Sequence, residues 1–155
     1  MSKVDHPRPG LTADTVVVRG APGRREVLLI RRGNPPYQGI WALPGGFLDP
    51  FEPPVDAARR ELAEETGLVY DGPLVLVGVY GEPGRDPRGW TVSAAYLALA
   101  PDDSGPVAGA DDAAEARWFP VGDLPALAFD HVVIVRDALT ALGEELPGSG
   151  AAEPL

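Results

Sequence analysis

The sequence predicts an α/β fold, an α/β/α sandwich in which helices cover a mixed β-sheet. Short runs rich in β-branched and other apolar residues recur along the 155-residue chain and are typical of strands. Helical patterns occur at only two places, one in mid-chain and one near the C-terminal end. Strands that outnumber helices, with a helix inserted among them, favour helical layers packed against a single sheet.

The first half of the chain is expected to hold an arm and three strands. Residues 1–11 are interpreted as a flexible arm, because they contain two prolines and a glycine. Thr15–Arg19 and Glu26–Ile30 are predicted strands joined by a turn at residues 21–23, where Pro and Gly favour a change of direction. A third, shorter strand is predicted over Ile40–Leu43.

A helix is predicted over Pro54–Thr66. Proline is tolerated in the first turn of a helix, and Gly67 is the residue type that commonly ends one. Val55, Ala58 and Leu62 recur at helical spacing and form one apolar stripe. The stripe predicts that this helix packs one side against the sheet.

The second half of the chain continues the sheet and then ends in a tail. Further strands are predicted over Leu74–Tyr80, Thr91–Ala100 and Ala116–Val121, and a second helix over His131–Leu142. Residues 12–143 are therefore expected to form one domain. Residues 144–155 are expected to be disordered, since Gly, Ala, Pro, Ser and Glu predominate there.

Composition narrows the classes of function. A formal net charge of −10 argues against a nucleic-acid surface, which needs clustered Lys and Arg. The absence of cysteine excludes disulfides, thiolate zinc sites and cysteine nucleophiles. The sequence contains neither an apolar run that would span a bilayer nor the apolar centre of a signal peptide. We therefore expect a cytoplasmic protein with no nucleic-acid and no membrane partner.

Three carboxylates gather on the predicted mid-chain helix. Glu61, Glu64 and Glu65 are spaced i, i+3 and i+4, so a helix brings them to one side. One interpretation is a solvated acidic face. The other is a metal site, because Gly45-Gly46 just ahead of the helix is expected to be a flexible loop whose carbonyl can approach an ion. Oxygen ligands without His or Cys nearby suit Mg²⁺ or Mn²⁺, which favours phosphoryl chemistry.

The spacing around this helix resembles a known motif. Gly46 is followed after five residues by Glu52, and after seven more by Arg60-Glu61-Leu62-Ala63-Glu64-Glu65-Thr66-Gly67-Leu68. This pattern matches the Nudix box at every specified position. The resemblance to Nudix hydrolases implies the Nudix fold, an α/β/α sandwich with a mixed sheet, from about Thr12 to Leu142.

The resemblance also implies roles for residues of the box. Glu61 and Glu65 resemble the main carboxylate ligands of Mg²⁺ (or Mn²⁺), and the Gly45 carbonyl resembles the backbone ligand. Glu64 corresponds either to a further metal ligand or to the catalytic group that positions water. Glu52 and Arg60 correspond to a pair that holds the loop against the helix through a charge-assisted hydrogen bond.

Segments outside the box resemble one branch of the family. Pro83 lies fifteen residues beyond Leu68, the spacing of ADP-ribose pyrophosphatases, and residues 36–44, 80–89 and 128–131 also resemble that branch. The residues predicted to bind substrate are Arg32, Tyr37, Pro83, Arg85 and Arg88. The arginines would contact phosphate or ribose and Tyr37 would stack on a purine; solvated arginines and an aromatic that caps the core are the alternatives.

A second acidic group precedes the last predicted strand. Asp111, Asp112 and Glu115 lie close together in the sequence. Several Nudix enzymes place an additional metal-binding or base carboxylate at this end of the chain, so Glu115 joins Glu64 as a catalytic candidate. A solvated loop is the alternative. Neither His6 nor His131 suggests a catalytic dyad.

The resemblance implies Mg²⁺-dependent hydrolysis of a pyrophosphate bond in a nucleoside diphosphate derivative. ADP-ribose, cleaved to AMP and ribose 5-phosphate, is the predicted substrate. Two alternatives stay open. One is a sanitising pyrophosphatase for nucleoside triphosphates, and the other is a non-catalytic ADP-ribose sensor. The resemblance to the ADP-ribose branch also implies a homodimer.

Overall fold

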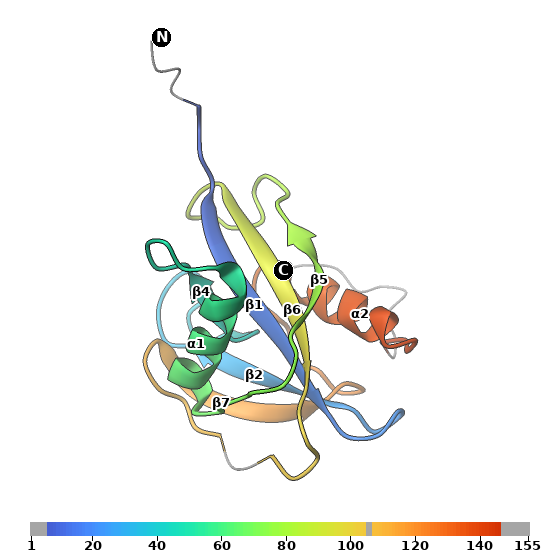
Figure 1. Cartoon of the computed structure of the whole chain (residues 1–155). Helices are drawn as coiled ribbons and strands as arrows, with labels where there is room; N and C mark the ends of the chain where they lie inside the picture. Colours follow the sequence, from blue (N-terminus) through green and yellow to red (C-terminus); the bar gives the residue numbers. More distant parts are fainter. Residues whose placement is uncertain (1–5, 105–106, 147–155) are drawn as a thin grey trace.

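A single mixed β-sheet is the centre of the computed structural model, which describes residues 6–104 and 107–146 (Figure 1). Five strands follow the order β3-β2-β1-β6-β5, while β4 also pairs with β1 and β7 with β2. The elements in chain order are β1 (Gly10–Arg19), β2 (Glu26–Arg32), β3 (Trp41–Ala42), β4 (Gly45–Phe47), α1 (Pro54–Thr66), β5 (Val75–Tyr80), β6 (Thr91–Leu99), β7 (Ala113–Pro120) and α2 (His131–Ala141). The strands β1 and β6 run parallel and their other neighbours run antiparallel, as a mixed sheet requires.

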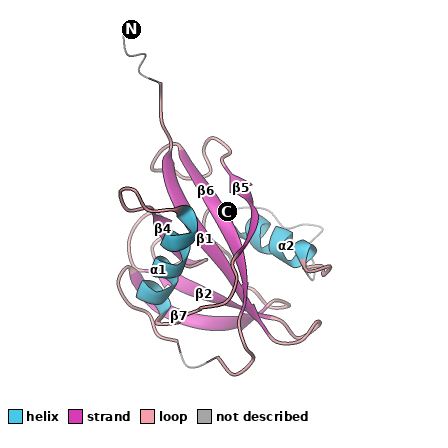
Figure 2. Ribbon diagram, in the orientation of Figure 1, coloured by secondary structure: helices cyan, strands magenta, loops and turns pink. Residues whose placement is uncertain are grey.

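The two helices pack on opposite faces of the sheet. Successive residues of β1 point to opposite faces, and Val16 and Val18 pack in the same core cluster as Ile134 of α2. Val17, which lies between them, packs instead with Leu62 of α1. The strands lie between the two helices in Figure 2. The predicted α/β/α sandwich is therefore confirmed.

Helix α1 has the bounds that the sequence predicts. Ala57, Ala58 and Leu62 are buried against the sheet, whereas Val55 of the predicted stripe is only partly buried. Gly67 ends the helix in a left-handed conformation with a φ of 75°, and its N–H donates to the Ala63 carbonyl at 2.9 Å. A glycine adopts this conformation without the strain that a side chain would add.

Two predictions for the N-terminal half are wrong. The strand β1 begins at Gly10 and not at Thr15, so Gly10 and Leu11 of the predicted arm belong to the sheet. Residues 1–5 of the arm lie outside the described residues. Gly45-Gly46 is not a free loop, because both residues belong to β4 and pair with β1. Pairing on both sides of β1 keeps its polar first half in the sheet.

The C-terminal part of the domain also differs from its prediction. The expected disordered tail begins at Glu144, but Glu144 forms an ion pair of 3.0 Å with Arg25, and Leu146 is buried in the core. The rest of the tail, 147–155, lies outside the described residues. Within the described part of the chain, neither helix has the length and apolar character needed to cross a membrane.

Candidate active site

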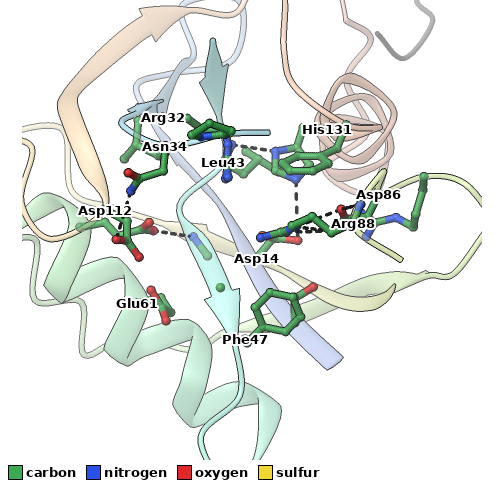
Figure 3. A pocket seen from close by; sticks show the side chains of 18 residues that line it. Asp14, Arg32, Asn34, Leu43, Phe47, Glu61, Asp86, Arg88, Asp112 and His131 are labelled. Carbon is green, nitrogen blue, oxygen red and sulfur yellow. Dashed lines mark hydrogen bonds and ion pairs between the residues drawn. The ribbon is translucent and has the colours of Figure 1, made fainter. Parts of the chain in front are cut away.

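A cavity of about 320 Å³ opens where the sheet, α1 and the start of α2 meet. This volume is at the lower end of the range for small-molecule sites. In Figure 3, Glu61 and Asp112 lie on one side of the β4 ribbon, and Arg88 and Asp86 lie on the other. Glu61 of α1 and Arg88 therefore lie on different sides of β4 in one cavity.

One wall of the cavity, the carboxylate wall, consists of the Glu61 and Glu65 side chains of α1 and the adjacent Gly45 of β4. The Glu65 side chain is buried, and its Oε1 accepts a hydrogen bond of 2.7 Å from the Gly45 N–H. Burial, together with the nearby negative charge of Glu61, raises the pKa of the Glu65 carboxyl to about 8, although the hydrogen bond from the Gly45 N–H lowers it. Burial also raises the pKa of Glu61. A cation at this wall would offset the cost of burying both charges.

Both glycines of β4 are required by close packing. A Cβ at Gly46 would lie 2.7 Å from Glu61 Oε1, and a Cβ at Gly45 would overlap Asp14 Oδ1 and the Ala13 carbonyl oxygen. The absence of side chains brings the β4 backbone next to Glu61 and Glu65. The sequence pattern that first suggested a flexible loop is explained by this close approach.

The donor chemistry of the carboxylate wall fits a divalent cation that prefers oxygen. Two glutamates on one helix line the wall, and burial disfavours the ionised form of both. Carboxylate oxygens are ligands that Mg²⁺ and Mn²⁺ prefer. Glu64 lies outside the lining, half-exposed, and pairs with Arg60 at 3.1 Å. Within residues 6–104 and 107–146, no three Asp, Glu, His or Cys side chains are already gathered as an ion-binding group. Glu61 and Glu65 are therefore the residues best placed to hold such an ion.

Arg60 links the loop before α1 to the acidic side of the helix. It forms two hydrogen bonds of 2.8 Å with Glu52, which is the pair that the family resemblance implies. The same guanidinium donates to Glu61 at 2.9 Å and to the Phe47 carbonyl at 3.2 Å. One arginine thus fixes the end of β4, the loop and a carboxylate of the cavity relative to one another.

The Glu52–Arg60 pair makes a prediction for stability against pH. The hydrogen bonds from Arg60 lower the pKa of Glu52 to about 2, below its ordinary value near 4.5. The stability that the ionised group contributes is present above pH 4.5 and is lost as the pH falls toward 2. We expect Glu52→Gln to lower the melting temperature at pH 7, and the two melting curves to converge in acid. Thermal unfolding at a series of pH values measures this, and a difference between the two proteins that is the same at pH 7 and pH 2.5 would contradict it.

The arginine wall of the cavity consists of Arg32, Arg85 and Arg88. The Arg88 guanidinium is partly exposed, pairs with the buried Asp86 at 2.7 Å and lies 5.0 Å from the Phe47 ring centre. Arg32 donates through Nε to the Pro36 carbonyl at 2.7 Å. Burial lowers the pKa of Arg32 from its ordinary value. These cations face the space that an anionic ligand would enter.

Arg85 differs from the other two arginines because its hydrogen-bonding edge is already used. Its Nε donates to Asp130 Oδ2 at 2.9 Å and its Nη2 to Asp130 Oδ1 at 2.6 Å. The Arg85 side chain is only 5% exposed. Arg85 lines the cavity, and the substrate contact predicted for it stays a prediction that would have to compete with this internal ion pair.

Six predicted site residues do not line the cavity. Glu52, Arg60 and Glu64 belong to the ion-pair network of Arg60, and the other three are Tyr37, Pro83 and Glu115. Tyr37 packs edge-on against Phe129, with ring centres 4.8 Å apart, and Pro83 is exposed. Glu115 lies in β7 and not in a loop, because that strand begins at Ala113, and its carboxylate pairs across the strands with Arg31 at 3.4 Å. The loop predicted around Glu115 is therefore wrong, because this residue belongs to a strand. The substrate contacts of Tyr37 and Pro83 and the catalytic role of Glu115 stay predictions.

The cavity also contains polar residues that the sequence analysis did not select. Asp14 and His131 are both buried and line it, and so does Asp112, which belongs to the same acidic group of the sequence as Glu115. Asp14 accepts a hydrogen bond from Ser93, and Asp112 accepts one from Asn34 at 3.5 Å. A carboxylate inside the apolar run of β1 is an available sequence signal for Asp14. Nothing comparable marks His131, because its environment arises only when α2 meets the sheet.

Comparisons with known proteins show the family of this chain. The family model of the NUDIX domain matches residues 9–139. The ADP-ribose pyrophosphatase of Methanocaldococcus jannaschii is 40% identical over 131 residues, which cover 83% of this chain and 72% of that protein. The ADPR responsive transcriptional repressor NtrR of Acinetobacter baylyi is 42% identical over 100 residues, which cover 63% of this chain and 39% of the repressor. The NUDIX domain of Shewanella oneidensis NrtR, solved with ADP ribose, aligns with a TM-score of 0.79 at 32% identity, over 88% of this chain and 90% of that chain.

Proposed function

The chain belongs to the NUDIX domain family and is a Nudix hydrolase, and from this premise we propose that it hydrolyses ADP-ribose to AMP and ribose 5-phosphate in a reaction that depends on Mg²⁺ or Mn²⁺. The observation that carries the proposal is the pairing of a carboxylate wall with an arginine wall in one cavity. The archaeal relative named ADP-ribose pyrophosphatase supports the choice of substrate.

The two walls suit the two charges of the proposed complex. A diphosphate is anionic, and Arg88 and Arg32 provide guanidinium groups that bind phosphate oxygens. The carboxylates of Glu61 and Glu65 repel that diphosphate unless a cation lies between them. Glu61, Glu65 and the Gly45 carbonyl are the groups that would hold the cation.

The chemistry divides between the bound ion and the side chains. When bound, a divalent cation neutralises the diphosphate and polarises the phosphorus that is attacked. Glu64, at the solvent-exposed rim, accepts the proton of the attacking water in this proposal. Arg60 holds Glu61 and Glu64 at 2.9 and 3.1 Å, and Arg88 orients the diphosphate from the opposite wall.

Removal of the metal and analysis of products test the proposal. We expect EDTA to abolish turnover and excess MgCl₂ to restore it, because the carboxylate wall cannot bind the diphosphate alone. With ADP-ribose the expected products are AMP and ribose 5-phosphate, separated by ion-exchange chromatography. Full turnover in EDTA would contradict the metal site, and a much faster reaction with nucleoside triphosphates would establish the sanitising alternative.

A sensor role is the second candidate, because one relative is a repressor that responds to ADPR. In that case ADP-ribose would bind in calorimetry and would not be cleaved in the presence of Mg²⁺. The box carboxylates are all present in this chain, which favours catalysis. The homodimer, the cytoplasmic location and the absence of a nucleic-acid partner stay predictions. Sedimentation of the protein alone tests the homodimer, and sedimentation with DNA tests the absence of a nucleic-acid partner.

A further inference from the structure

The first turn of α2 connects two parts of the cavity. Asp130 and His131 are neighbours in the chain, and both follow Phe129, which has a φ of 54° that bulky residues rarely adopt. Residues 128–131 resemble the ADP-ribose branch of the family, and Asp130 and His131 take part in no chemical step of the proposed reaction. Their contacts nevertheless reach opposite walls.

Asp130 fixes the arginine wall. Its carboxylate holds Arg85 through two hydrogen bonds, and both side chains are shielded from solvent. The loop that carries Arg85 also carries Asp86, whose buried carboxylate binds the Arg88 side chain and the Arg88 backbone N–H. The position of Arg88 in the cavity therefore depends on the Arg85–Asp130 pair.

His131 fixes the segment that leads into the carboxylate wall. Its Nδ1 accepts a hydrogen bond of 3.0 Å from the Leu43 N–H, two residues before Gly45 (Figure 3). The proton of the neutral ring is then on Nε2, which faces Asp14 Oδ2 at 3.9 Å. Asp14 in turn lies so close to Gly45 that a Cβ on this glycine would overlap Asp14 Oδ1. His131 thus sets where the β4 backbone passes Glu65.

We propose that Asp130 and His131 form a bracing pair that sets the separation of the carboxylate and arginine walls. Arg85 is consequently a positioning residue that acts through Arg88, and it does not bind the substrate itself. This inference rests on the proposed function for the identity of the ligand. The geometry of the brace is independent of the proposed function, because it involves only contacts within the chain.

A double-mutant cycle separates positioning from substrate binding. Arg85→Met alone leaves the Asp130 charge buried without its partner, and we expect KM to rise about tenfold while kcat changes little. The combined Arg85→Met and Asp130→Leu protein has an apolar pair in the same place, and we expect its KM to return to within about threefold of the wild-type value. If Arg85 binds substrate, the double variant keeps the full KM defect, which would overturn the proposal.

Arg25→Met is the matched control. Arg25 forms a similarly shielded ion pair with Glu144, away from the residues that line the cavity. The Arg25→Met substitution should lower the melting temperature and leave KM unchanged. If Arg25→Met raised KM as much as Arg85→Met, the KM effect would reflect general destabilisation, and the proposal would fail.

The second arm is tested at His131. His131→Asn keeps an acceptor near the position of Nδ1, whereas His131→Leu leaves the buried Leu43 N–H without one. We expect His131→Leu to lower kcat at least about tenfold with Mg²⁺ saturating, and His131→Asn to recover most of it. Circular dichroism checks that both variants are folded. If the folded Leu and Asn variants had equal kcat, the hydrogen bond of His131 would not position the site, and His131 would not be part of the brace.

The assay keeps this inference separate from the proposed function. KM and kcat are measured with whichever nucleotide the wild-type protein hydrolyses, and the Kd of ADP-ribose replaces KM if there is binding without turnover. A wild-type protein that prefers nucleoside triphosphates would contradict the proposed substrate alone. The cycle at Arg85 and Asp130 would still decide whether the brace exists.

Discussion

Glu65→Gln is expected to lower kcat by about three orders of magnitude, which corresponds to the several kcal/mol that a bound divalent ion contributes to such reactions. Glu65 is the most deeply buried carboxylate of the carboxylate wall. Its amide replacement retains an oxygen that can accept the hydrogen bond from the Gly45 N–H. The fold should therefore survive while the charge that binds the cation is lost. Steady-state kinetics over a range of Mg²⁺ concentrations measures both effects.

The stability of the metal-free protein provides a second measurement on the same variant. Burial opposes ionisation of Glu65, so the neutral Gln should not lower the melting temperature in EDTA. Asp56→Asn is the matched control, because Asp56 is an exposed carboxylate in the first turn of the same helix. It should leave kcat and Mg²⁺ dependence unchanged. A Glu65→Gln protein with wild-type kcat and wild-type Mg²⁺ dependence would exclude the proposed metal site.

Local sequence signals predicted the parts of this protein that are determined locally. The bounds of α1 follow from its prolines, Gly67 and apolar spacing, and all are properties of neighbouring residues. The helical spacing predicted that Glu61 and Glu65 would lie together, and both line the cavity, whereas Glu64 does not. The family that the box indicated is confirmed by the NUDIX domain match. The ends of β1 and β7 were misplaced because pairing with β4, β6 and β2 extends them beyond their apolar runs.

The remaining features of the site depend on contacts between distant segments. Asp130 meets Arg85 across 45 positions, and His131 meets Leu43 across 88. No spacing rule connects such residues, so the ion pair of Asp130 with Arg85 and the hydrogen bond of His131 with Leu43 could not be predicted. Tyr37 was assigned to substrate by residue type, whereas the fold directs its ring to Phe129.

Gly45→Ala and Gly46→Ala are expected to have large effects of different kinds. The Cβ of Ala at position 45 would overlap the Ala13 carbonyl oxygen, a backbone atom that cannot move without disrupting the pairing of β4 with β1. We therefore expect destabilisation by about 1–3 kcal/mol together with loss of activity. The Cβ at position 46 would meet only the end of the flexible Glu61 side chain. That carboxylate can turn away, so stability should change by less than about 0.5 kcal/mol.

The activity of Gly46→Ala distinguishes the two consequences of close packing. Displacing the Glu61 carboxylate by about 1 Å is expected to reduce kcat about a hundredfold, because the groups of the site must be held in register. Gly122→Ala is the matched control, since a Cβ there meets no atom within 4 Å and Gly122 lies outside the cavity lining. Urea unfolding and kcat are measured on all three variants. The opposite result would be a Gly46→Ala protein that is as destabilised as Gly45→Ala but keeps its kcat. It would mean that both glycines are needed only for packing within the sheet, and that catalysis does not depend on the present position of Glu61.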